Sequence, residues 1–307
     1  MSIRPQLEET ALHRLLKRHF VMVTRLQPLS LGQTAQVYRL DADGRGYILR
    51  ISTASIVDRF RKERFVGERF GAAMLPVPAI IHIGEYEGFE YAISIEAAGH
   101  ALEIIPREAV HPFIPAIMAI SDAMCRADVA HTQGYGWFDP EGNGSSDHWA
   151  DHFLHLTHED PPDSFYGSWH SLFQTTFLEE DVFQRFLAVM MALLEYCPDE
   201  RYLVHGNFSL PNLIGQQGHI TGVVDWADAR FGDFLYDVAS LALWYPMLSF
   251  PEHFRAHYQH LGLTVSHFEQ RLLCYQLYIG LDALRFFAKI GDEKMYRWVK
   301  ARMDSLL

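Results

Sequence analysis

Residues 203–237, LVHGNFSLPNLIGQQGHITGVVDWADARFGDFLYD, decide the fold. A short apolar segment leads into a polar loop, a Gly-containing hairpin follows, and a second apolar segment ends at Asp225. This order places Asn212, at the end of the loop, beside Asp225 at adjacent strand ends. Both side chains offer oxygen atoms, which are the ligands that Mg²⁺ prefers. The stretch therefore predicts a magnesium site made of Asn212 and Asp225.

The loop has the spacing of a phosphoryl-transfer centre. Kinases use a catalytic loop of the form His-x-Asp-x-x-x-x-Asn, followed by an Asp at the end of the next strand. Here the loop begins at His205, has Asn207 at its third position and ends at Asn212. Asn207 stands where a carboxylate would accept the proton of the attacking hydroxyl. Trp226 follows Asp225 in place of Phe-Gly, which points away from protein kinases.

The chain resembles the aminoglycoside phosphotransferase family, and within it the hygromycin branch. The matching segments are GRGYILRIS (44–52), LPVPAIIHIGE (75–85), YAIS (91–94), LVHGNF (203–208), ITGVVDWADARFGD (220–233) and IGLDAL (279–284). The resemblance implies an α+β, two-lobed, protein-kinase-like fold. A small N-lobe with an antiparallel sheet would span residues 1–97, and a larger, mostly helical C-lobe residues 98–307. ATP or GTP, with Mg²⁺, would bind between the lobes.

The resemblance also assigns a phosphate-binding cation. Arg50 lies on the strand where kinases carry a lysine that contacts the α- and β-phosphates, and arginine can donate to phosphate through two N–H groups. Such a cation pairs with a Glu on the following helix. We prefer Glu63 to Glu68, because Glu63 matches an acidic position of the family. The other interpretation is an ion pair on a solvated helix face.

The expected hinge between the lobes is the segment 94–99, which contains Glu96 and Ala98. The resemblance implies that its backbone amides and carbonyls read the edge of the adenine ring. The segment SLGQTAQ (30–36) lies where kinases place a loop over the phosphates, although its single glycine also fits an ordinary β-turn.

Two carboxylates follow the metal-site strand at a spacing of four. Asp233 and Asp237 fit simple carboxylates at a helix start. In the family such a pair braces the catalytic loop, and we expect that role here. For His205, a structural hydrogen-bonding role in the loop is a better fit than a proton shuttle.

Asp228, Trp244 and Asp282 are the candidate acceptor-binding residues. They follow from the resemblance, which implies that carboxylates of the C-lobe hold the ammonium groups of an aminoglycoside. The formal net charge of −12 suits a cationic substrate and disfavours nucleic acid. The three cysteines, Cys125, Cys197 and Cys274, are widely spaced, which favours reduced thiols and a cytoplasmic protein. There is no apolar run long enough to span a membrane. We expect a monomer.

Asn207 has three explanations. It fits an engineered Asp→Asn change, a natural loss of catalysis, or an enzyme that works without a strong base. We prefer the first, because every other element of the centre is intact. In each case we expect the fold of an O-phosphotransferase. We expect phosphoryl transfer by this chain to be impaired or slow. The alternatives are a non-catalytic protein that binds nucleotide or antibiotic, and a kinase of another small alcohol.

Apolar periodicity predicts the remaining elements. Helices are expected at 6–19, 55–73, 112–127, 180–196, 234–247, 252–260 and 265–289, and strands at 36–40, 47–52, 79–84 and 90–95. The Gly-, Asp- and Ser-rich segment 131–147 is expected to be a long functional loop, with Trp137 either stacking on a sugar or lying at the edge of the core.

Overall fold

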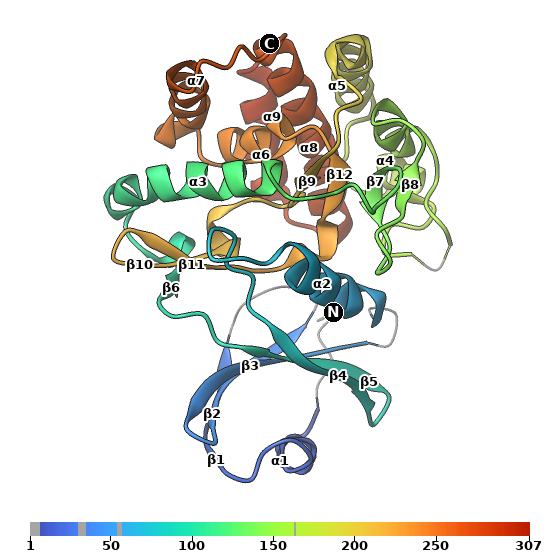
Figure 1. Cartoon of the computed structure of the whole chain (residues 1–307). Helices are drawn as coiled ribbons and strands as arrows, with labels where there is room; N and C mark the ends of the chain where they lie inside the picture. Colours follow the sequence, from blue (N-terminus) through green and yellow to red (C-terminus); the bar gives the residue numbers. More distant parts are fainter. Residues whose placement is uncertain (1–6, 30–34, 54–56, 163) are drawn as a thin grey trace. The chain divides into compact units, whose positions relative to one another are not determined.

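The computed structural model describes residues 7–29, 35–53, 57–162 and 164–307 (Figure 1). The chain forms two compact units. Unit 1 comprises the residues up to Pro106 with 139–142 and 211–227, and unit 2 comprises 107–138, 143–210 and 228–307. The short segment that carries Asn212 and Asp225 therefore belongs to unit 1. Most of the predicted phosphate loop, residues 30–34, lies outside the described ranges.

Five antiparallel strands form the main sheet of unit 1. They are β1 (Val23–Leu29), β2 (Gln36–Ala42), β3 (Arg45–Thr53), β4 (Ile80–Tyr86) and β5 (Phe89–Ile95), in the spatial order β1-β2-β3-β5-β4. β2 to β5 lie where the sequence predicted strands. The prediction missed β1, because its sequence VTRLQPL lacks apolar alternation and contains a proline. Both features are typical of an edge strand, and β1 lies at the edge of this sheet.

Helix α1 (Glu9–Leu16) covers one face of this sheet. Its buried Leu12, Leu15 and Leu16 pack in one hydrophobic cluster with residues of β2, β3 and β5, among them Leu40 and Ile93. Each fully buried leucine contributes about 1.5–3 kcal/mol to folding. The amphipathic spacing predicted this helix, although it is shorter than the expected 6–19.

Helix α2 (Val57–Phe70) and a second, three-stranded sheet complete unit 1. The strands are β6 (His100–Ala101), β10 (Leu213–Gln216) and β11 (His219–Val223), in the order β11-β10-β6. The antiparallel hairpin of β10 and β11 is the Gly-containing hairpin expected from the sequence. It sets Leu213 opposite Val223, so the residues that flank this pair are brought together.

Unit 2 is mostly helical (Figure 1). Its helices are α3 (Ile114–Cys125), α4 (Leu172–Thr175), α5 (Glu180–Leu193), α6 (Leu235–Trp244), α7 (Phe250–His260), α8 (Phe268–Ile290) and α9 (Glu293–Asp304). Short 3₁₀ turns include η5 (Ala150–Thr157), η8 (Leu210–Asn212) and η9 (Trp226–Asp228), of which η9 begins in unit 1. The 23-residue α8 contacts α5, α6 and α9, and its buried face is mostly apolar but includes Arg271 and Arg285. This matches the mostly helical C-terminal region expected from the sequence.

A four-stranded sheet lies in unit 2 beside these helices. Its order is β8-β7-β12-β9, with β7 (Tyr135–Phe138), β8 (Gly144–Ser146), β9 (Tyr202–Val204) and β12 (Arg230–Gly232). β7 and β8 fall inside the segment 131–147, so the expectation of one long loop there was wrong. Glycines dominate the segment because Gly134 and Gly136 have positive φ values. They concealed the strand pattern.

Helix α9 was not predicted from the sequence. Its apolar residues Tyr296, Val299 and Met303 recur at helical spacing, and all three are buried. Asp292 caps the helix by accepting a hydrogen bond from the N–H of Met295 at 3.0 Å. Both signals were available in the sequence. None of the helices in the described ranges is long and apolar enough to cross a bilayer.

Candidate active site

The loop that follows β9 is held by its backbone. The N–H groups of His205 and Gly206 donate to the two carboxylate oxygens of Asp237, at 2.7 and 3.0 Å. His205 is fully buried, and its Nδ1 accepts a hydrogen bond from the N–H of Asn207 at 3.3 Å. These hydrogen bonds are typical of a histidine that stabilises a loop. Asp237, in the first turn of α6, fixes where the loop begins.

Gly206 allows the loop to turn tightly. Its φ is +82°, and a Cβ at this position would overlap the carbonyl oxygen of Asp228. Both properties require glycine.

Asn207 is half-buried on this loop. Its Oδ1 accepts a hydrogen bond from the hydroxyl of Ser209 at 3.4 Å, and the same hydroxyl lies 3.2 Å from the carbonyl oxygen of Asn207. An Asn at this position keeps the size and hydrogen-bonding capacity of an Asp, but it cannot accept a proton at neutral pH. The loop conformation therefore does not depend on a carboxylate at position 207.

Two buried carboxylates anchor α6 on either side of its first turn. Asp233, fully buried, accepts from Nε and Nη2 of Arg271 at 2.8 and 2.6 Å and from the hydroxyl of Tyr275 at 2.6 Å. Burial raises the pKa of Asp237 to about 7, although its two backbone donors and Arg230 favour the ionised form. Asp237 accepts hydrogen bonds from the loop, and Asp233 is held by α8 just before the start of α6, which is the arrangement expected from the family resemblance.

The predicted metal ligands lie at the two ends of one hairpin in unit 1. Asn212 directly precedes β10, Asp225 lies two residues after the end of β11, and the N–H of Val224 donates to the carbonyl oxygen of Asn212 at 3.0 Å. Asp225 is exposed and has a positive φ of 63°, a conformation that Asp tolerates better than most residues. One amide and one carboxylate oxygen suit Mg²⁺, which usually keeps water and phosphate as its other ligands.

Arg50 and Glu63 form the ion pair that the sequence suggested. Nη1 and Nη2 of Arg50 donate to the two carboxylate oxygens of Glu63, at 2.9 and 2.6 Å. The guanidinium also lies 5.0 Å from the centre of the Phe60 ring. Burial acts to lower the pKa of Arg50, but Glu63, and after it Asp225, raise it above the usual value. The charge of Asp225, a predicted metal ligand, therefore acts on the guanidinium of Arg50 on β3.

The predicted hinge segment is tied to both sheets of unit 1. Glu96 pairs with Arg39 at 2.8 Å, and its N–H donates to the carbonyl oxygen of Gly46 at 3.1 Å. The carbonyl oxygen of Ala98 accepts from the hydroxyl of Thr221. The Glu96 side chain therefore belongs to the sheet, and a ligand at this segment would meet backbone groups.

The predicted acceptor residues separate into two places in unit 2. Asp228 and Asp282 both raise the pKa of the buried Tyr236, whose shift comes mainly from burial, so they lie near the same phenol. Trp244 instead stacks on Trp298 of α9, with ring centres 5.7 Å apart. The described structure records no interaction between Trp244 and either carboxylate.

The family of this chain follows from its similarity to known proteins. Residues 25–272 match the profile of the phosphotransferase enzyme family, abbreviated APH. This chain belongs to the APH phosphotransferase family. It is 33% identical over 307 residues to hygromycin-B 4-O-kinase of Escherichia coli, a match that covers 99% of this chain and 86% of the relative. The predicted family and enzyme class, an alcohol-directed phosphotransferase, are confirmed.

Solved structures confirm the protein-kinase-like fold of this phosphotransferase. A thermostable variant of the aminoglycoside phosphotransferase APH(4)-Ia, in a ternary complex with AMP-PNP and hygromycin B, matches with a TM-score of 0.83 and 32% identity, over 96% of this chain and 97% of that one. A macrolide 2'-phosphotransferase type I matches with a TM-score of 0.60 at 15% identity, over 97% and 98% of the two chains. That second likeness shows the fold alone.

Three positioning residues of the phosphotransferase were not found from its sequence. Nζ of Lys62 on α2 donates to the carbonyl oxygen of Ala227, just after the metal-site strand, at 3.0 Å. Arg271 holds Asp233 from α8. Arg230 is almost fully buried, and its Nε donates to the carbonyl oxygen of Asp228 at 3.1 Å. A lysine beside Glu63 and an arginine in a strand gave no local signal, because each partner lies elsewhere in the fold.

Proposed function

We propose that this phosphotransferase transfers the γ-phosphoryl group of ATP or GTP to a hydroxyl of a cationic aminoglycoside of the hygromycin B type. The observation that carries the proposal is the 33% identity, over nearly the whole chain, to a relative named hygromycin-B 4-O-kinase. The loop that Asp237 holds through the N–H groups of His205 and Gly206 supports the proposal.

Unit 1 supplies the residues that would hold the nucleotide. Arg50, fixed by Glu63, would donate to the phosphates as a planar guanidinium. Backbone groups near Glu96 and Ala98 would meet the adenine ring. Mg²⁺ held by Asn212 and Asp225 would neutralise the charge of the triphosphate.

Unit 2 supplies the residues that would hold the acceptor. Asp228 is half-buried and the side chain of Asp282 is 45% exposed, so both can meet an ammonium group. Oδ1 of Asp282 accepts a hydrogen bond from Nη2 of Arg285 at 2.8 Å, so this carboxylate is held in place by a buried guanidinium. Trp244, stacked on Trp298, offers an aromatic face at some distance from these carboxylates, and we retain it as an outer contact of the acceptor.

Asn207 sets the rate in this proposal. The attacking hydroxyl would be oriented by Asn207, while its proton would leave without a positioned base. Phosphoryl transfer can still proceed without a positioned base, though more slowly, because its transition state is largely dissociative. We therefore expect slow turnover and intact binding. The predicted cytoplasmic location, the monomeric state and the origin of Asn207 stay predictions.

Asn207 also favours one alternative, a protein that binds nucleotide or antibiotic without turnover. A phosphotransfer assay with ATP, Mg²⁺ and either hygromycin B or kanamycin separates the two. The proposed function requires slow, stoichiometric appearance of phosphorylated hygromycin B above the rate without protein. Tight binding of hygromycin B with no product would establish the alternative. Binding of neither aminoglycoside would leave a kinase of another alcohol.

A further inference from the structure

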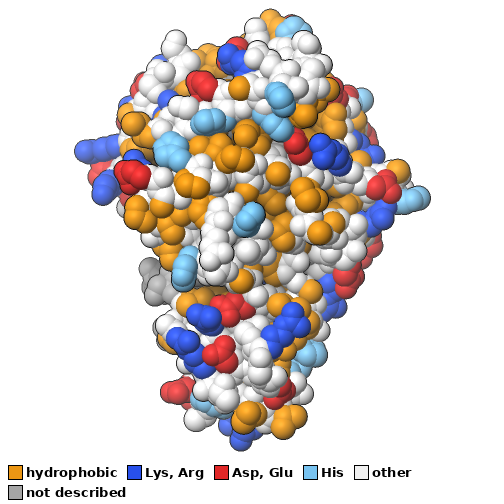
Figure 2. All heavy atoms as spheres, turned by 60° about the vertical axis from the view of Figure 1, so that its left-hand side comes forward, with side chains coloured by type: hydrophobic (Ala, Val, Ile, Leu, Met, Phe, Trp, Pro, Cys, Tyr) orange, Lys and Arg blue, Asp and Glu red, His pale blue; other side chains and the backbone are white. Residues whose placement is uncertain are grey.

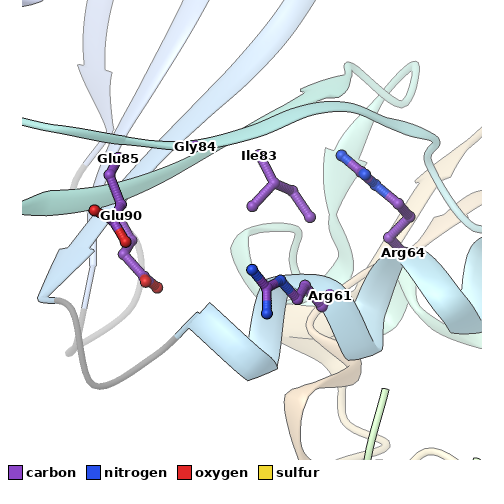
Figure 3. Close-up of a pocket in the computed structure, with 6 residues that line it drawn as sticks. All are labelled: Arg61, Arg64, Ile83, Gly84, Glu85 and Glu90. Atoms are coloured by element: carbon purple, nitrogen blue, oxygen red, sulfur yellow. The ribbon is translucent and has the colours of Figure 1, made fainter. Parts of the chain in front are cut away.

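A hollow lies in unit 1, on the side of α2 that faces β4 and β5 (Figure 3). Its volume is about 420 Å³, within the range of small-molecule sites. The lining residues are Arg61 and Arg64 of α2, Ile83, Gly84 and Glu85 of β4, and Glu90 of β5. None of them belongs to the proposed active site.

Glu90 is the unusual member of this lining. It is only 1% exposed, and neither of its carboxylate oxygens has a hydrogen-bond partner among the described residues. Burial, and then the charge of Glu85, raise its pKa, while Arg61 lowers it. An unpaired buried carboxyl group is unfavourable because it loses its hydration, and such groups almost always have partners. A protein retains one only where something offsets that cost.

Glu85 makes the arrangement less favourable still. The antiparallel register of β4 and β5 sets Glu85 directly opposite Glu90. Like charges in directly opposed strand positions destabilise a sheet. A cation between the two carboxylates would remove this repulsion.

The opposite wall is basic. Figure 3 shows Glu85 and Glu90 on one side of the hollow, Arg61 and Arg64 on the other, and Ile83 between them. No ion pair within 4.0 Å joins either arginine to Glu85 or Glu90 in the described structure, where Arg61 pairs at 3.9 Å with the exposed Asp58. The Nε of Arg64 is buried without a hydrogen-bond partner. The two walls are therefore complementary in charge, but they do not meet.

We propose that this hollow binds a small zwitterion of the amino-acid class, with its ammonium group at Glu85 and Glu90 and its carboxylate at Arg61 and Arg64. A divalent cation would meet only two carboxylates and would face two guanidinium groups. A simple anion would face Glu85 and Glu90. A polycation would be repelled by the arginines. A molecule with one charge of each sign compensates both walls.

Occupancy would also join α2 to β4 and β5. Because α2 carries Glu63, the partner of Arg50, a bound zwitterion would restrain the cation assigned to the nucleotide phosphates. This consequence rests on the proposed function. The binding itself does not, and it is measured without nucleotide or acceptor.

Isothermal titration of the full chain at low ionic strength tests the proposal. The probes are glycine, 4-aminobutyrate and 6-aminohexanoate, which keep both charges and vary the distance between them. One member should bind saturably, and butyrate and butylamine, with one charge each, should bind at least tenfold more weakly. Glu90→Gln and Arg64→Met should each weaken binding at least tenfold. Glu87→Gln is the matched control, because Glu87 is exposed in the turn between the same strands and pairs with Arg14 outside the hollow.

Three results would overturn the proposal: no binding of any probe, butylamine binding as tightly as the best zwitterion, or unchanged binding in the Arg64 variant. If Glu90→Gln does not fold, as judged by circular dichroism, Glu85→Gln at the exposed neighbouring position replaces it. A loss of at least tenfold is again expected there, and unchanged affinity would refute the site. Glu90→Gln should also stabilise the empty protein, because the neutral amide removes the repulsion from Glu85.

Discussion

Arg271 holds both carboxylate oxygens of Asp233 through two N–H groups, in a place where both side chains are almost completely shielded from water. The pair links α8 to Asp233, which lies two residues before the start of α6. Since α6 also carries Asp237, the loop of Asn207 is positioned through this buried contact.

Breaking this pair on one side should strongly destabilise unit 2. Arg271→Met leaves the charge of Asp233 buried and unpaired, which typically costs about 3–5 kcal/mol. The double variant with Asp233→Asn should recover part of the loss, because no buried charge is then left alone. Urea unfolding of the four proteins of this cycle measures the coupling. Strictly additive losses would contradict the proposed link.

Gly206→Ala should cost more than Gly88→Ala. Both glycines have φ values near +80°, so each alanine pays the left-handed penalty of about 1–2 kcal/mol. At Gly88 nothing lies within 4 Å of the new Cβ, whereas at Gly206 it overlaps the backbone oxygen of Asp228. Overpacking of this kind adds about 1–3 kcal/mol. Equal unfolding free energies for the two variants would show that the loop is not tightly held.

Asn207→Asp should raise kcat for hygromycin B by about 10²–10⁴-fold, which is the usual contribution of a positioned general base. KM for the nucleotide should change little, because Arg50, Asn212 and Asp225 are untouched. Steady-state assays of the two proteins provide the comparison, and Asn207→Ala serves as a variant that can neither orient nor deprotonate the hydroxyl. If the Asp variant were no faster, the proposed role of position 207 would be wrong.

Asp225→Ala should abolish the dependence of nucleotide binding on Mg²⁺. Calorimetry with ATP should show that the present chain binds more weakly without the ion, and that the variant binds equally weakly with and without it. Glu68→Ala, on the exposed face of α2, is the control and should behave like the unchanged chain. A variant that still responds to Mg²⁺ would place the metal ligands elsewhere.

The contribution of His19 and His155 to the free energy of unfolding should fall as the pH drops below about 6.5, against the opposite contribution of the buried Asp237. Burial lowers the pKa of His155, and burial together with His82 and Arg18 lowers that of His19. Both side chains therefore bind protons more readily in the unfolded chain, so stability is complete above the ordinary histidine pKa and is lost on acidification.

Urea titrations at pH 7 and pH 5 test this dependence. In the double variant His19→Gln with His155→Gln, the loss of stability between pH 7 and pH 5 that these two histidines cause should disappear, whereas His253→Gln, at an exposed position of α7, should leave the pH dependence unchanged. An unaltered pH slope in the double variant would assign the effect to other groups.

The sequence predicted the elements whose signals are local. The hairpin of Asn212 and Asp225 and the helix of Glu63 follow from short-range patterns, whereas the pairing of Glu63 with Arg50 was expected from the family resemblance. Residues that act across the chain escaped prediction. Lys62 meets a backbone oxygen 165 residues away, and Arg230 lies 2.8 Å from Nε2 of a histidine 78 residues away. No spacing rule connects such partners, because packing alone brings them together.

The arrangement of charged side chains on the surface could not be predicted from the sequence either. Figure 2 shows one face of the molecule, with hydrophobic side chains spread among charged ones and histidines. From the sequence, Glu85 and Glu90 are two ordinary strand carboxylates. Only the register of β4 and β5 sets them opposite each other beside the arginines of α2.

The backbone-held loop of His205 and Gly206 has a consequence for the history of such proteins. Because Asp237 accepts hydrogen bonds from main-chain N–H groups, a change of the side chain at position 207 leaves the loop conformation intact. The codons of Asp and Asn differ by a single base. A gene that encodes this scaffold can therefore exchange Asp and Asn at position 207 in one mutational event, and return by the same step, without a change of fold.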